Sequence, residues 1–209
     1  MKIAVVCANG KAGKLIVEEA LRRGHVVTAI VRGENRSAAE KVLVKNLFDL
    51  TAEDLAGFDV VINAFGAWTP ETIPQIAQSE KHLADVLEGT TVRLMMVGGA
   101  GSLFTNAEHT QTLDMGPDFP EDWKPLSASH GTALADLRER KALSWTYVSP
   151  AADFQAEGER TGKYLLAGEE LTLNDRGESV ISYADYAIAM VDEAEKGEHA
   201  GQRISVVRA

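Results

Sequence analysis

The chain has 209 residues, of which 45% are hydrophobic, 25% are charged and 6% are aromatic. This composition excludes a disordered or fibrous chain and predicts one well-packed domain. The formal net charge of −10 would repel a phosphate backbone, so we expect no nucleic-acid partner. The only cysteine, Cys7, can form no internal disulfide, and metal sites built from several cysteines are excluded.

No apolar stretch approaches the roughly 20 residues that are needed to cross a bilayer. The apolar run from Ile3 to Cys7 is too short for the core of a signal peptide, and it leads into the turn dipeptide Asn9-Gly10. Together with the single cysteine, these features predict a cytoplasmic protein that has no membrane partner.

Short β-branched runs alternate with helical patterns over residues 1–150, which is typical of parallel strands joined by crossover helices. The expected strands span residues 3–7, 25–31, 42–45, 59–64, 92–97 and 145–149, and the expected helices span 12–23, 72–88, 127–141 and 183–196. The predicted fold class is α/β, a Rossmann doubly wound parallel sheet with helices on both faces. We expect a single domain over residues 1–209, with a small C-terminal extension at about 150–182.

Two later segments carry clear local signals. The helix at 183–196 has Ser182 as a predicted N-cap, Asp185 near its positive end and Gly197 where a left-handed residue is favoured. The irregular stretch at 99–126 is rich in Gly, Pro, Asn and Asp and is longer than ordinary loops. It is a candidate for a substrate-facing lid, and a surface excursion without function is an equal alternative.

A glycine turn follows the first expected strand and opens the first expected helix. It contains Cys7, Ala8, Asn9, Gly10, Lys11, Ala12 and Gly13. A strand, a glycine turn and a helix N-terminus in this order direct backbone N–H groups at an anion such as a pyrophosphate. Gly10 lets the backbone approach the phosphate and Gly13 lets the helix pack close to the strand, whereas Cys7 replaces the usual first glycine. A tight turn without a ligand is the alternative.

Arginines follow the second expected strand, where cofactor sites for NAD carry an acid. Arg32 ends the strand and Arg36 lies four residues later. Two guanidinium groups suit a 2′-phosphate because each can donate a forked pair of hydrogen bonds. Glu34 could instead reach a ribose, and solvated arginines are a further alternative. With Lys11 nearby, the pattern favours NADPH, and NADH remains possible.

These motifs resemble an atypical short-chain dehydrogenase/reductase. The resemblance is carried by the glycine turn 8–13, the Arg32/Arg36 segment 31–36, the segment 119–125 and the segment 181–187. Among such proteins the chain is most similar to NAD(P)H-flavin reductases and NmrA-like NAD(P)-binding proteins, and more distantly to biliverdin-IXβ/flavin reductase. The resemblance implies an NAD(P)-binding domain whose extension lies on the substrate side.

The resemblance also implies further cofactor contacts. Asn46 and Leu47 would lie against the adenine, and Ala64, Phe65 and Gly66 along the middle of the cofactor. Gly98 and Gly99 would lie beside the nicotinamide. Glycine at the end of a parallel strand lets a flat ring come close, although simple turn formation explains glycine equally well.

The proton donor pair of ordinary short-chain dehydrogenases, Tyr-x-x-x-Lys, is absent. The residues four positions after the four tyrosines are Ala151, Gly168, Ala187 and Met190. The candidate catalytic residues are therefore His130, by resemblance a proton donor or hydrogen-bonding group, and Ser102. A packed or solvated histidine is an equal alternative. The remaining histidines show no spacing typical of a metal site, so we expect no catalytic metal.

The most favoured function is an NAD(P)H-dependent reductase that transfers hydride to a flavin, a quinone or a similar planar small molecule. Such an acceptor needs little acid catalysis, because it is already electrophilic. The first alternative is a non-catalytic NAD(P)-binding sensor of NmrA-like type, and the second is an enzyme similar to sugar-nucleotide epimerases. We expect a monomer or a homodimer.

Overall fold

The fold is built on an eight-stranded sheet in a computed structural model that describes residues 1–209. The strand order is β3-β2-β1-β4-β5-β6-β10-β8. The strands are β1 (Lys2–Val6), β2 (Val26–Val31), β3 (Lys41–Val44), β4 (Val60–Asn63), β5 (Arg93–Val97), β6 (Trp145–Ser149), β8 (Tyr164–Ala167) and β10 (Gln202–Arg208). Every neighbouring pair is parallel except β10 and β8. The predicted Rossmann-like α/β fold is confirmed.

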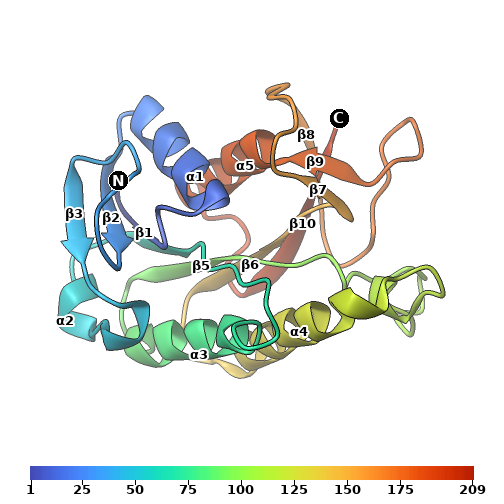
Figure 1. Cartoon of the computed structure of the whole chain (residues 1–209), viewed down its shortest axis with the longest axis horizontal. Helices are drawn as coiled ribbons and strands as arrows, with labels where there is room; N and C mark the ends of the chain where they lie inside the picture. The colour runs from blue at the N-terminus through green and yellow to red at the C-terminus, as the bar shows by residue number, and fades with distance from the viewer.

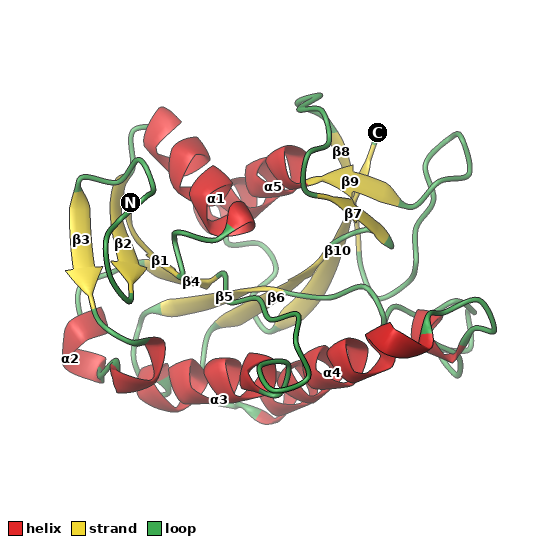
Figure 2. Ribbon diagram, in the orientation of Figure 1, coloured by secondary structure: helices red, strands yellow, loops and turns green.

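Helices cover both faces of this sheet. They are α1 (Lys11–Arg22), α2 (Ala52–Leu55), α3 (Gln75–Leu87), α4 (Lys124–Glu139) and α5 (Tyr183–Lys196). Figure 1 shows α1 and α5 above the sheet and α3 and α4 below it, and Figure 2 shows the resulting three layers. No helix is long and apolar enough to span a membrane.

The burial of both sheet faces explains the apolar strands. Ile3 and Val5 of β1 belong to the hydrophobic cluster that also contains Ile16 of α1 and Tyr186 of α5. Ala4 and Val6, one position along, belong to the second cluster, with α3 and α4. Because successive side chains of a strand point to opposite faces, a strand covered on both sides must be apolar throughout.

The six expected strands and four expected helices all exist, with bounds within three residues of those predicted. Ser182 caps α5, its hydroxyl accepting from the N–H of Asp185 at 3.0 Å, and Gly197 ends the helix at φ 66°. Sequence patterns missed α2, β7 (Asp153–Gln155), β8, β9 (Val180–Ser182) and β10. With three or four residues each, β7, β8 and β9 are too short to show a period of two, whereas β10 has seven residues and was simply not recognised.

Residues 150–182 are divided between two sheets. β8 pairs antiparallel with β10 at the edge of the main sheet, whereas β7 and β9 form a separate parallel pair. This pair places Phe154 beside Ile181, immediately before the start of α5. The chain therefore brings residues from two distant segments to the edge of the sheet where the parallel strands end.

Candidate functional site

The glycine turn connects the end of β1 to the start of α1. Cys7 has φ 61°, in the left-handed region that favours glycine, so this position keeps the conformation of the usual first glycine while carrying a side chain. Such a conformation costs an L-residue about 1–2 kcal/mol. Gly10 precedes α1 without a side-chain cap, and the first turn of the helix holds no acidic residue. Its N–H groups are therefore available to an anion.

Gly13 is required by the contact between α1 and the end of β1. A Cβ on Gly13 would lie 2.6 Å from the carbonyl oxygen of Cys7 and 3.0 Å from the Cα of Ala8. These are backbone atoms that cannot move aside, so any side chain would push the helix away from the strand. Gly10 is less restricted, because its Cβ would lie 3.3 Å from the Cys7 oxygen. The turn thus fits the close backbone approach of a pyrophosphate.

A cleft with a volume of 1140 Å³ follows the carboxyl ends of β1 to β5. Thirteen of the residues predicted from the sequence line it: Asn9, Gly10, Lys11, Ala12, Arg32, Arg36, Asn46, Leu47, Ala64, Phe65, Gly66, Gly98 and His130. Four others, Ala8, Gly13, Gly99 and Ser102, do not. Ala8, Gly13 and Gly99 belong to the packing behind the cleft, while Ser102 lies elsewhere.

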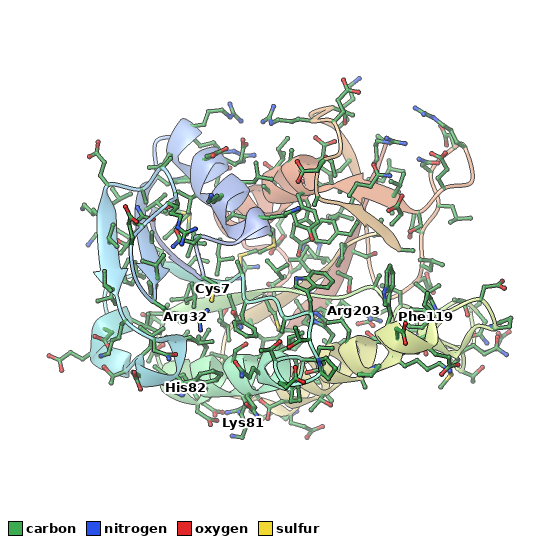
Figure 3. All side chains as sticks on the ribbon, viewed as in Figure 1. Cys7, Arg32, Lys81, His82, Phe119 and Arg203 are labelled. Carbon is green, nitrogen blue, oxygen red and sulfur yellow. The ribbon has the colours of Figure 1, made fainter.

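Asn9 ties the glycine turn to the loop that carries the two arginines. Its side-chain amide donates to the carbonyl oxygen of Glu34 at 2.8 Å, and its Oδ1 accepts from the N–H of Arg36 at 2.6 Å. Figure 3 shows Arg32 close to Cys7, and both line the cleft. The guanidinium groups of Arg32 and Arg36 have no hydrogen-bond or ion-pair partner in the chain and are free to bind an anion.

The other cations of the cleft are already paired. Lys45 Nζ lies 2.6 Å from Asp54 Oδ2. Lys11 Nζ lies 3.1 Å from Glu157 Oε1, but both side chains are highly exposed, so this pair contributes little stability and can open for a ligand. The charges that remain available are those of the arginine loop and, on opening, that of Lys11.

The segment after β3 forms one end of the cleft. Asn46 Oδ1 accepts from the N–H of Phe48 at 3.1 Å and so caps a short 3-10 helix over Leu47–Asp49. Leu47 is buried, and Phe48 adds an aromatic wall that sequence reasoning missed. The signal was available, because Phe48 directly follows the two residues that the resemblance places against an adenine.

Gly98 and Gly99 lack a side chain because of contacts within the protein, whereas the sequence suggested the approach of a nicotinamide ring. A Cβ on Gly98 would lie 2.3 Å from the ring of Tyr147, and one on Gly99 would lie 2.9 Å from the ring of His130. The Tyr147 hydroxyl accepts from the Gly99 N–H at 2.9 Å and lies 3.3 Å from His130 Nδ1. The two glycines therefore make room for protein rings behind the cleft.

His130 lines the cleft beside Gly98, at the end of β5. In an ordinary environment a histidine changes charge near neutral pH. Burial lowers the pKa of its imidazole to about 4, so it is neutral at physiological pH. Burial also raises the pKa of the Tyr147 hydroxyl far above its ordinary value. A neutral His130 can form hydrogen bonds to a ligand, but it is a poor proton donor.

Ser102 does not line the cleft, and after Gly99 the stretch 99–126 leads away from it. Arg203 donates to both the carbonyl oxygen and the hydroxyl of Ser102, each at 2.9 Å, and so ties the stretch to β10. No residue from 99 to 126 lines the cleft, and Figure 3 shows Phe119 at the other end of the molecule from Cys7 and Arg32. The structure therefore gives the stretch the position of a surface excursion.

Besides Phe48, three aromatic cleft residues were not found from the sequence: Trp68, Phe154 and Tyr183. Trp68 follows the predicted contact Gly66 by two residues and could have been found from that spacing. Phe154 and Tyr183 could not, because they come together only through the pairing of β7 with β9. No group of three or more His, Cys, Asp or Glu side chains is arranged to hold a metal ion.

Comparisons with known proteins agree with this geometry. The crystal structure of SP1627 from Streptococcus pneumoniae TIGR4, named a "putative NADH-flavin reductase", is 55% identical over 100% of both chains, with a TM-score of 0.98. The uncharacterized protein YwnB of Bacillus subtilis (strain 168) is 43% identical over 99% of this chain and 98% of its own.

A "putative epimerase" from Bacteroides thetaiotaomicron is 34% identical over 99% of this chain and 96% of its own, with a TM-score of 0.86. Residues 7–195 match the family described as NAD(P)H-binding, from the glycine turn to the end of α5. The match includes the glycine turn, the loop with Arg32 and Arg36, and the cleft segments after β4 and β5. The chain therefore belongs to the NAD(P)H-binding family of Rossmann-like proteins.

Proposed function

We propose that the protein is an NAD(P)H-dependent oxidoreductase that transfers a hydride to a flavin or a similar planar acceptor in the cytoplasm. One observation carries the proposal: a single cleft joins a phosphate-binding turn to an end that holds aromatic rings and no strong acid. The 55% identity to SP1627 supports the same reaction class.

Each part of the cleft has a proposed role in holding the cofactor. The N-terminus of α1, with Gly10, Lys11 and Ala12, holds the pyrophosphate. Arg32 and Arg36 bind the 2′-phosphate, which gives a preference for NADPH. The remaining contacts follow the order of the strands: Asn46 and Leu47 for the adenine, Ala64, Phe65 and Gly66 for the middle, and Gly98, backed by Gly99, for the nicotinamide.

The chemistry asks the protein for positioning more than for acid catalysis. The bound cofactor supplies a hydride, and the acceptor takes up that hydride and one proton from water. The cleft holds the two flat rings against each other, which lowers the barrier by orientation. His130, neutral and uncharged at pH 7, forms a hydrogen bond to one of the rings and donates no proton to the reaction.

The proposal is tested by following NADPH absorbance with riboflavin, FMN and a simple quinone in turn. We expect oxidation of NADPH with at least one of them, with the reduced acceptor and NADP⁺ formed in equal amounts. A protein that binds NADPH but oxidises it with none of these acceptors, nor with simple carbonyl compounds, contradicts the proposal. That result would identify a cofactor-binding sensor instead.

The cofactor preference depends on the arginine loop. Arg32→Asp removes charge-assisted hydrogen bonds to a 2′-phosphate, which are worth roughly 1.5–3 kcal/mol, and adds repulsion. The affinity for NADPH should fall by more than about tenfold while the affinity for NADH changes little. Titration calorimetry measures both.

Arg176→Asp is the matched control, because it makes the same charge change at an exposed residue outside the cleft. This variant should keep the affinity of the unchanged protein for both cofactors. If Arg32→Asp weakens NADPH and NADH equally, the arginine does not bind the 2′-phosphate.

The role of His130 is tested by His130→Ala. If positioning dominates, turnover should fall by less than about tenfold, whereas loss of a general acid typically costs about 10²–10⁴-fold. Since the pKa of His130 is about 4 in the folded protein, the imidazole is already deprotonated above pH 6. Rates of both proteins should therefore show no titration near pH 6.5 when measured from pH 6 to 9. A fall above pH 6.5 in the unchanged protein alone would assign His130 as the acid.

A further inference from the structure

The charge of the cleft changes along its length. All of its charged lining side chains come from the glycine turn and the segments after β2 and β3: Lys11, Arg32, Glu34, Arg36 and Lys45. The lining residues after β5 and in the segments of Phe154 and Tyr183 carry no charge, because His130 is neutral at physiological pH, and the nearby Lys11 is paired with Glu157. In the proposed function the phosphates and adenosine bind at the first end, so the acceptor binds at the second.

The uncharged end has a fixed aromatic wall. The rings of Phe154 and Tyr183 lie with their centroids 3.9 Å apart, and both line the cleft. Phe154 also packs on Tyr186, with 4.8 Å between centroids. Tyr186 is fully buried, and its hydroxyl donates to the carbonyl oxygen of Val148 at 2.6 Å. The pair is therefore anchored to the core of the α5 layer.

A further aromatic side chain lines the same cleft from the opposite layer. Trp68 lies on the connection from β4 to α3, and α3 covers the other face of the sheet from α5. Trp68 lines the cleft, yet it is 73% exposed, the highest exposure of any large hydrophobic residue of the chain. Its indole face is therefore free to stack on a ligand.

We propose that Trp68 and the Phe154–Tyr183 pair form the two walls of an acceptor site that is specific for an uncharged planar conjugated ring. This inference rests on the proposed function and names the substrate class. The flat faces of an isoalloxazine or a quinone match aromatic walls on both sides. A phosphate or carboxylate on the acceptor gains little there, because Lys11, the cation whose charge reaches Tyr183, is already paired with Glu157 at 3.1 Å and in the proposed function binds the pyrophosphate. Riboflavin should therefore bind as well as FMN.

The test is a calorimetric titration of riboflavin into protein saturated with NADP⁺, because heat of binding reports affinity whether or not the indole that quenches the flavin is present. Trp68→Leu should weaken riboflavin binding by about tenfold, as expected for the loss of one stacked ring. Trp68→Phe should restore most of the affinity. The affinity for NADP⁺, measured by calorimetry, should be the same in all three proteins.

Trp123→Leu is the matched control, because Trp123 is also exposed but does not line the cleft. It should leave riboflavin affinity unchanged. Parallel titrations with FMN, and competition by an uncharged naphthoquinone, test the charge specificity. Affinities for riboflavin and FMN within about threefold of each other, together with competition by the quinone, support an uncharged site.

Two results overturn the inference: unchanged riboflavin affinity in Trp68→Leu, or FMN bound more than about tenfold more tightly than riboflavin. Failure of the acceptor site is distinguishable from failure of the proposed function. If riboflavin binding depends on Trp68 but no NADPH is oxidised, the acceptor site is supported and the proposed function is contradicted. If a flavin oxidises NADPH but its affinity does not depend on Trp68, the proposed function is supported and the proposed acceptor site is contradicted.

Discussion

The close contact between α1 and the end of β1 is the constraint on which the rest of the site depends. At Gly13 a single Cβ would come within 2.6 Å of the Cys7 carbonyl oxygen. Because glycine has no Cβ, the N-terminus of α1 lies directly at the carboxyl edge of the sheet, where its N–H groups face the cleft. Asn9 then links this turn to the arginine loop through two hydrogen bonds, so helix packing also fixes the position of the free cations.

The division of the cleft into a charged and an uncharged end follows from the order of the strands. The segment after β2 brings Arg32 and Arg36 to one side of the cleft, and the segment after β3 adds Lys45 on the same side. The end of β5 is backed by Tyr147, which is buried, and by His130, which is partly buried and neutral. A dinucleotide bound along the edge would have its phosphates beside cations and its reactive ring in surroundings of low polarity.

The sequence predicted the parts of the structure that depend on local patterns. The glycine turn and the Ser182 cap are examples, because each signal lies within a few residues of its effect. Phe154 and Tyr183 could not be predicted, since pairing of two three-residue strands brings them together. Glu80 is similar. A helical glutamate is expected to be exposed, yet it is fully buried without a hydrogen-bond partner, and burial raises its pKa to about 8. Only the packing of α3 against α4 determines that environment.

The most direct measurement of the central claim is a calorimetric titration of NADP⁺ into Gly13→Ala. The helix must move away from Cys7 and Ala8, so affinity should fall by more than about tenfold while circular dichroism still reports a folded protein. Gly131→Ala is the control, because a Cβ at this helical glycine meets nothing within 4 Å. This variant should bind NADP⁺ as tightly as the unchanged protein. Undiminished binding by Gly13→Ala would contradict the account, since the turn could then not be the phosphate site.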